Sequence, residues 1–199
     1  MIIKICGITT EADAAACARA GATALGFNFW PRSPRYVTPQ EASRPLAAVP
    51  SGVLKVGVFV DETAAVIESL VGELMLDVAQ VHGTLDRPLV VRHWTAYSAS
   101  TPGLKEILQS TGAEAVLIDT PAGEERGGTG RTFDWSLAAG LPGHVILAGG
   151  LGPDNVAEAI AAARPWGVDA SSRLEVAPGR KDIDKVRAFV EAARKAFEL

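Results

Sequence analysis

Residues 144–172 read HVILAGGLGPDNVAEAIAAARPWGVDASS and contain two apolar runs on either side of an Ala-rich segment. The first run (144–150) and the second (166–172) lack polar alternation, which is typical of parallel strands buried on both faces of a sheet. Between them, residues 152–164 have the pattern of a helix. The stretch therefore predicts a strand, a helix and a second strand parallel to the first.

The same pattern repeats along the rest of the chain. Strands are predicted at residues 2–6, 24–29, 54–60, 76–83, 88–94, 113–120, 144–150 and 166–172. Helices are predicted at residues 11–22, 38–49, 61–72, 101–112, 134–140, 152–164 and 182–198. Eight strands, nearly all followed by a helix, are the count of a closed (β/α)8 barrel, which has about 200 residues at its smallest. We therefore predict an α/β protein with a single compact (β/α)8 TIM barrel over residues 1–199. An open doubly wound sheet is the alternative, although no G-x-G-x-x-G motif follows the first strand.

The fourth crossover differs from the others. Only TLDRP (84–88) separates VHG (81–83) from LVV (89–91), and a helix of ordinary length does not fit there. We expect the helix between strands four and five to be missing or reduced to a turn. Its loss would expose barrel surface between neighbouring helices, where a partner subunit could pack.

Composition narrows the classes of function. The 199 residues are 48% apolar and 21% charged, as in an ordinary globular enzyme or binding protein. The net charge is -4 and there is no basic cluster, so neither nucleic acid nor an anionic membrane is an expected partner. No apolar run approaches the ~18 residues of a membrane span, and the N-terminus has no signal-peptide layout, so we expect a cytoplasmic protein. Cys6 and Cys17 do not make a disulfide framework.

Polar side chains stand at the ends of several predicted strands, where barrels of this kind place their active sites. Cys6 follows strand one, His82 strand four, Asp119 strand six and Asp169 strand eight. Of these, Cys6 and Asp119 are the two titratable residues best placed to share a reacting centre.

Segments of small residues, two of them glycine-rich, lie at or after the ends of the last three predicted strands. They are GGTG (127–130), AGG (148–150) and DASS (169–172). Backbone N–H groups without intervening side chains can surround an anion, so we expect a phosphorylated substrate. In the loop PRSPRY (31–36), Arg32 and Arg35 suit a substrate carboxylate, although composition alone would favour solvated loop arginines.

Along its whole length the chain resembles the phosphoribosylanthranilate isomerases. The motifs that carry the resemblance are KICGIT (4–9), GFNFWPRSPRYV (26–37), VGVFV (56–60), QVHG (80–83), LIDT (117–120), GGTGRTFDW (127–135), LAGGLGPDNV (147–156) and PGRKD (178–182). The resemblance implies a (β/α)8 barrel and an isomerase of tryptophan biosynthesis, either monomer or homodimer. It also implies the Amadori rearrangement of N-(5'-phosphoribosyl)anthranilate to 1-(o-carboxyphenylamino)-1-deoxyribulose 5-phosphate by general acid–base catalysis, with no cofactor and no metal.

The resemblance also assigns roles to single residues. It makes Cys6 the general base, Asp119 the general acid and Arg35 the partner of the anthranilate carboxylate. The phosphate would lie against Gly128, Thr129, Gly130, Gly149, Gly150, Ser171 and Ser172. His82, Asp169 and Arg173 are possible site-lining residues. A cysteine base must be a thiolate and an acid must keep its proton, so we expect the site to favour the thiolate of Cys6 and to raise the pKa of Asp119.

One residue beside the expected phosphate site departs from the family pattern. Arg173 stands where the family usually has a glycine after Ser-Ser. If that position needs φ > 0, the arginine is strained; otherwise it could bind the phosphate directly.

Two other functions stay open at this point. A histidine-pathway or dual-substrate aminoaldose-phosphate isomerase would carry a carboxylate where Cys6 stands. A non-catalytic phosphate-binding barrel would need neither Cys6 nor Asp119.

Overall fold

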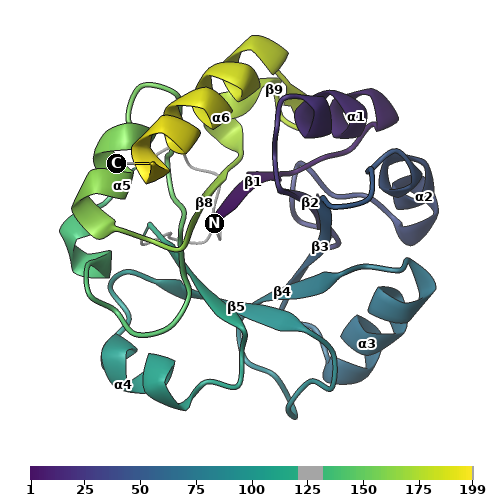
Figure 1. Cartoon of the computed structure of the whole chain (residues 1–199). Helices are drawn as coiled ribbons and strands as arrows, with labels where there is room; N and C mark the ends of the chain where they lie inside the picture. Colours follow the sequence, from purple (N-terminus) through teal and green to yellow (C-terminus); the bar gives the residue numbers. More distant parts are fainter. Residues whose placement is uncertain (121–131, 199) are drawn as a thin grey trace.

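The computed structural model describes residues 1–120 and 132–198, and within them eight parallel strands close into a barrel in sequence order (Figure 1). The strands are β1 (Ile2–Cys6), β2 (Ala24–Asn28), β3 (Leu54–Val60), β4 (Val78–His82), β5 (His93–Ser98), β6 (Ala115–Asp119), β7 (Val145–Leu147) and β8 (Gly167–Ala170). The helices are α1 (Glu11–Arg19), α2 (Pro39–Ala47), α3 (Ala64–Glu73), α4 (Leu104–Ser110), α5 (Val156–Ala163) and α6 (Ile183–Phe197). Short 3-10 helices lie at η1 (Trp135–Ala138) and η2 (Ser172–Leu174). The predicted (β/α)8 barrel is confirmed.

The helices surround the barrel, and α1, α2, α3 and α6 begin at side-chain caps. Thr38 opens α2 with a capping box, in which its hydroxyl accepts from the Glu41 N–H and the Glu41 carboxylate accepts from the Thr38 N–H. Thr10 and Asp182 cap α1 and α6, and each side chain accepts a hydrogen bond from the backbone N–H three residues later. Among the residues described, no helix combines the length and the apolar character that crossing a membrane requires.

The inside of the barrel has an apolar layer with a polar layer above it. The apolar layer consists of Ile2, Ala24, Val56, Val78, Trp94, Ala115, Leu117, Ile146 and Ala148. Because side chains alternate along a strand, the residue two positions after each of these also points inward. That rule places Lys4 above Ile2, Gln80 above Val78 and Asp119 above Leu117, toward the C-terminal ends of the strands.

The crossover between β4 and β5 contains no helix in residues 83–92, all of which the structure describes, as predicted. The predicted strand at 88–94 is wrong, however, because β5 begins only at His93. The residues before it turn toward α3 instead. The Arg87 guanidinium donates two hydrogen bonds to the Glu68 carboxylate, and the Val90 N–H donates to the same carboxylate. The apolar run around Val90, which is exposed, therefore belongs to the connection.

A short hairpin follows β8 and was not predicted. Strands β9 (Glu175–Ala177) and β10 (Arg180–Lys181) pair in antiparallel fashion around a turn at Gly179, where φ is 77°. Strands of two or three residues are too short to show a periodic pattern in sequence. The hairpin places two charged side chains, Glu175 and Lys181, beside the end of β1.

The contact that closes the barrel supplies a test of the fold. Strands β1 and β8 pair with Ile2 opposite Gly167, and a Cβ at Gly167 would lie 2.6 Å from the Ile2 Cβ and 2.8 Å from its carbonyl oxygen. Gly167→Ala should therefore lower the free energy of unfolding by about 1–3 kcal/mol, because the β1 backbone must move. Urea denaturation measures the change.

The matched control is Gly72→Ala in α3. A Cβ at Gly72 would meet nothing within 4 Å, so this change should raise the free energy of unfolding by about 0.5–1 kcal/mol through helix propensity. A Gly167→Ala variant at least as stable as the native chain would contradict the tight closure at Gly167.

Candidate active site

A cavity of about 570 Å³ opens at the C-terminal ends of the barrel strands. Of the residues proposed from sequence, it is lined by Cys6, Arg32, Arg35, His82, Asp119, Gly149, Gly150, Asp169, Ser171 and Ser172. Gly128, Thr129 and Gly130 lie outside the described residues. The candidate base and acid, both expected from their places at strand ends, therefore line the same cavity as the candidate carboxylate-binding arginine of the 31–36 loop.

A buried ion pair that sequence reasoning missed lies at the floor of this cavity. The Lys4 side chain is fully buried, and its Nζ is 2.9 Å from Oδ1 of Asp169. Burial alone would lower the pKa of Lys4, but the charge of Asp169 and its hydrogen bond, with a smaller contribution from Cys6, outweigh burial and hold that pKa above its ordinary value. Lys4 is thus an ammonium inside the barrel. The signal in the sequence was a lone lysine within an otherwise apolar strand.

Cys6 lies next to this ammonium. A Cβ at Gly26 would fall 2.8 Å from the Cys6 Sγ and 3.1 Å from the Lys4 Nζ, so the sulfur and the ammonium lie over the same glycine. The thiol has partial contact with the cavity, and the surrounding barrel wall still raises its pKa by burial. Lys4 acts in the opposite direction and lowers the pKa of Cys6. Burial prevails and the pKa of Cys6 is raised, so the expectation that the surrounding residues favour the thiolate is wrong.

Asp119 has the property expected of an acid. Burial raises its pKa to about 6, although a hydrogen bond from the Thr120 N–H to Oδ1, 2.7 Å long, works against the rise. A Cβ at Gly149 would lie 2.8 Å from the same Oδ1 and would also collide with Thr120. Gly149, with φ at 86°, therefore allows the end of β7 to pack closely over the carboxyl group.

Gln80 and His82 form a second polar pair on the cavity wall. The Gln80 Nε2 and the His82 Nε2 are 2.9 Å apart. The Gln80 amide oxygen is buried and has no hydrogen-bond partner within the described part of the chain. Sequence reasoning named His82 and missed Gln80, although the glutamine stands in the same QVHG motif.

Arg35 reaches the cavity but is already paired on one edge. Its Nε and Nη2 donate to the Glu175 carboxylate at 2.9 and 2.7 Å. Its aliphatic stem packs over Gly7, where a Cβ would collide with the arginine. The pKa of Arg35 is raised, because its hydrogen bonds and ion pair with Glu175 outweigh the effect of burial.

Arg173 lies behind the glycines of the expected phosphate site. Among non-glycine residues of the described ranges, positive φ occurs at Asp61, Met75 and Arg164, so the strained alternative for Arg173 is wrong. Its guanidinium donates to the Gly150 carbonyl at 3.1 Å and to Asp154 at 2.7 Å. It is not among the described residues that line the cavity.

Known proteins resemble this chain along nearly its whole length. The family model described as N-(5'phosphoribosyl)anthranilate (PRA) isomerase matches residues 3–192. The N-(5'-phosphoribosyl)anthranilate isomerase of Solibacter usitatus is 49% identical over 201 residues, covering 99% of each chain.

Solved structures agree as well. The crystal structure of phosphoribosyl anthranilate isomerase from Thermotoga maritima has a TM-score of 0.87 and 36% identity, covering 98% of this chain and 100% of that one. A crystal structure of the isomerase with reduced 1-(o-carboxyphenylamino)-1-deoxyribulose 5-phosphate has a TM-score of 0.84 and 33% identity, with the same coverage. On the family match and these relatives, the chain belongs to the N-(5'-phosphoribosyl)anthranilate isomerase family.

Proposed function

We propose that Cys6 and Asp119 are the base and the acid with which this chain isomerises N-(5'-phosphoribosyl)anthranilate to 1-(o-carboxyphenylamino)-1-deoxyribulose 5-phosphate, a step of tryptophan biosynthesis. The observation that carries the assignment is that one cavity holds both groups, with an ammonium beside the thiol and a carboxyl group that burial keeps protonated up to about pH 6. Lys4 beside the thiol favours its ionised form, whereas burial favours the protonated form of the Asp119 carboxyl group, as the two roles require.

The acid works first. The Asp119 carboxyl group gives its proton to the ribose ring oxygen, and the ring opens to a Schiff base. A raised pKa suits this step, because a carboxylic acid of ordinary pKa would have lost its proton near neutrality.

The base works second. The Cys6 thiolate takes the proton from C2', and the resulting enolamine tautomerises to the ketone. Lys4 supports this step, because its positive charge stabilises a thiolate next to it. The cationic Schiff base adds a second positive charge at the moment when the thiolate is needed. Tautomerisation removes the proton of the 2'-hydroxyl and adds one at C1'. The enzyme ends each cycle unchanged when Cys6 gives up its proton and Asp119 regains one, through the product or through solvent.

The cavity also offers partners for the two ends of the substrate. Arg35 stands on the side of the β2 loop and would hold the anthranilate carboxylate. Gly149, Gly150, Ser171 and Ser172 stand at the ends of β7 and β8 and would hold the phosphate together with residues 128–130. The unpartnered oxygen of Gln80 would accept a hydrogen bond from a ribose hydroxyl.

The wider expectations from sequence belong to the same proposal. The chain acts as one domain on a phosphorylated small molecule, in the cytoplasm, as a monomer or homodimer. Nucleic acid and membranes are not among its proposed partners, and Arg173 supports the phosphate site through the Gly150 carbonyl.

Loss of either proton carrier should abolish catalysis. Cys6→Ser and Asp119→Asn should each lower kcat by about 10²- to 10⁴-fold, the usual contribution of a positioned acid or base. Loss of substrate fluorescence follows the reaction. Cys17→Ala is the matched control, because Cys17 is buried in α1 within the outer core, and it should retain native turnover. Native turnover in either of the first two variants would contradict the assignment.

The raised pKa of Asp119 should also make the free energy of unfolding depend on pH. Between about pH 4 and pH 6 the folded chain binds more protons at this residue than the unfolded chain, so stability falls as pH rises through that window. Asp119→Asn removes this cost and can keep the hydrogen bond from Thr120. The free energy of unfolding of the variant minus that of the native chain should therefore be about 1–3 kcal/mol larger at neutral pH than near pH 4.

Urea denaturation at the two pH values measures this gain. Asp184→Asn is the control, because it removes an exposed carboxylate of the same charge and should give the same difference from the native chain at both pH values. If Asp119→Asn behaved like the control, the carboxyl group would not have a raised pKa.

The ammonium of Lys4 should lower the pKa of Cys6. We expect Lys4→Met with Asp169→Asn, which removes both charges and so leaves no unpaired buried ion, to raise the thiol pKa, because Lys4 lowers that pKa by more than Asp169 raises it. The rate of alkylation by iodoacetamide as a function of pH, in a Cys17→Ala background, measures that pKa. Lys195→Met, at an exposed position, should leave it unchanged. An unchanged or lower thiol pKa in the double variant would show that Lys4 does not support the base.

A further inference from the structure

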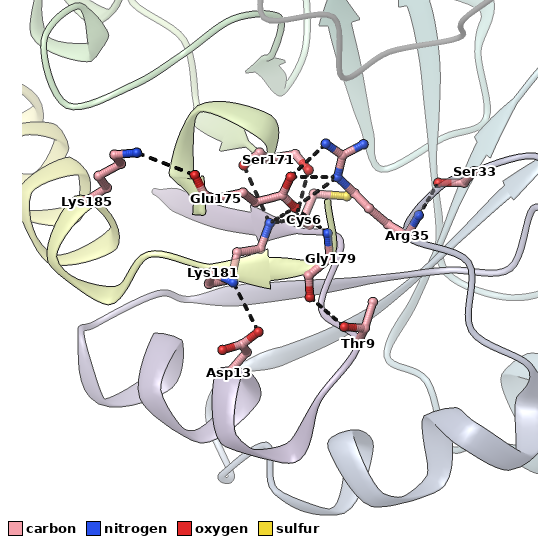
Figure 2. Close-up of polar contacts among 10 residues, drawn as sticks. All are labelled: Cys6, Thr9, Asp13, Ser33, Arg35, Ser171, Glu175, Gly179, Lys181 and Lys185. Atoms are coloured by element: carbon pink, nitrogen blue, oxygen red, sulfur yellow. Dashed lines mark hydrogen bonds and ion pairs between the residues drawn. The ribbon is translucent and has the colours of Figure 1, made fainter. Parts of the chain in front are cut away.

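The side chain of Glu175 is almost fully buried between two cations. Its exposed fraction is 4%, and its carboxylate accepts from Arg35 on one side and from Lys181 on the other. Figure 2 shows the glutamate between them, at the first residue of β9. Burial alone would raise the pKa of Glu175, but the two cations hold it below its ordinary value, so the group is a carboxylate. The cluster contains one negative and two positive charges, and a net charge of +1 remains.

The geometry of the Arg35 pair leaves one edge of the guanidinium available. Glu175 accepts from Nε and from Nη2, while Nη1 donates to no group in the described part of the chain. A guanidinium has five N–H donors in a rigid plane, so fixing the Nε–Nη2 edge also fixes the direction of the Nη1–Nη2 edge. Arg35 lines the cavity, and its stem is held against Gly7. The remaining edge is therefore a preformed fork for a second carboxylate.

Lys181, the second cation of the cluster, contacts the backbone of Cys6. The Lys181 Nζ is 2.8 Å from Glu175 Oε1 and donates to the Cys6 carbonyl oxygen at 2.6 Å. The Ser171 hydroxyl donates to the same carbonyl at 3.0 Å. One carboxylate thus sets both the arginine beside the cavity and, through Lys181, the end of the strand that carries the thiol.

Stability alone is a weak reason for such a cluster, because buried ion pairs contribute little net free energy compared with apolar residues of the same size. Resting on the function proposed above, we propose that Glu175 is a positioning residue that orients Arg35 for the carboxylate of the substrate. Glu175 itself touches no substrate. It sets the preference of the site for a carboxylated aminosugar phosphate over one without the carboxylate.

The test compares two ligands by calorimetry. One is reduced 1-(o-carboxyphenylamino)-1-deoxyribulose 5-phosphate, and the other is the same compound without the carboxyl group. The native chain should bind the first about 10- to 100-fold more tightly, as expected for a charge-assisted two-bond contact. In Glu175→Gln, whose amide cannot accept both guanidinium bonds, this ratio should fall to within about threefold of unity.

Two controls separate positioning from folding. Glu114 forms the same kind of fork with Nε and Nη2 of Arg92, at 2.6 and 2.7 Å, far along the chain at the start of β6. Glu114→Gln should leave the ligand ratio at its native value. If Glu175→Gln does not fold, Glu175→Asp keeps the charge but shortens the side chain by about 1.5 Å, which breaks the fork and should reduce the ratio in the same way.

Each outcome has a separate meaning. A native ratio in a folded Glu175→Gln or Glu175→Asp variant would overturn the positioning role. A native chain without any preference for the carboxylated ligand would instead overturn the proposed role of Arg35. In turnover, the expected signature is a KM raised about tenfold or more with a smaller change in kcat; a fall confined to kcat would contradict the positioning role.

Discussion

A lysine inside the barrel constrains much of this molecule. An ammonium taken out of water is costly unless a partner compensates it, and Lys4 has no exposed surface. Its partner, Asp169, lies on β8 at the point where β8 pairs with β1 to close the barrel. The pair therefore joins the first and last strands, and above it the interior becomes polar. Cys6 stands in that polar layer, one inward position above Lys4.

A second constraint comes from the alternation of side chains along each strand. Ile2, Val78 and Leu117 point inward in the apolar layer. The residue two positions after each of them also points inward and is polar. The apolar layer, with Trp94 fully buried in it, supports the layer in which the chemistry takes place. A shift of one residue in any of these strands would turn its polar side chain into the outer core. Packing and catalysis are in this sense fixed by the same register.

Much of the fold could be predicted from sequence, because buried parallel strands are continuous apolar runs and because their number is characteristic. The error at β5 had the same origin: the segment around Val90 is as apolar as a strand, yet it forms the connection and packs toward Glu68. The ends of strands also predicted Cys6 and Asp119. Local patterns could not reveal pairs that are distant in sequence, such as Lys4 with Asp169 or Arg35 with Glu175. Nor could they reveal a hairpin of two- and three-residue strands.

The most direct test of the account is a crystal structure of this chain with reduced 1-(o-carboxyphenylamino)-1-deoxyribulose 5-phosphate. We expect the Cys6 sulfur within about 3.5 Å of the carbon that corresponds to C2' of the substrate, the distance of a productive contact. We also expect the ligand carboxylate on the open edge of Arg35, Asp119 beside the oxygen released from the ring, and the phosphate at Gly149 and Gly150. A ligand bound in the reverse direction, with its phosphate on Arg35 and the sulfur facing away from that carbon, would contradict this arrangement.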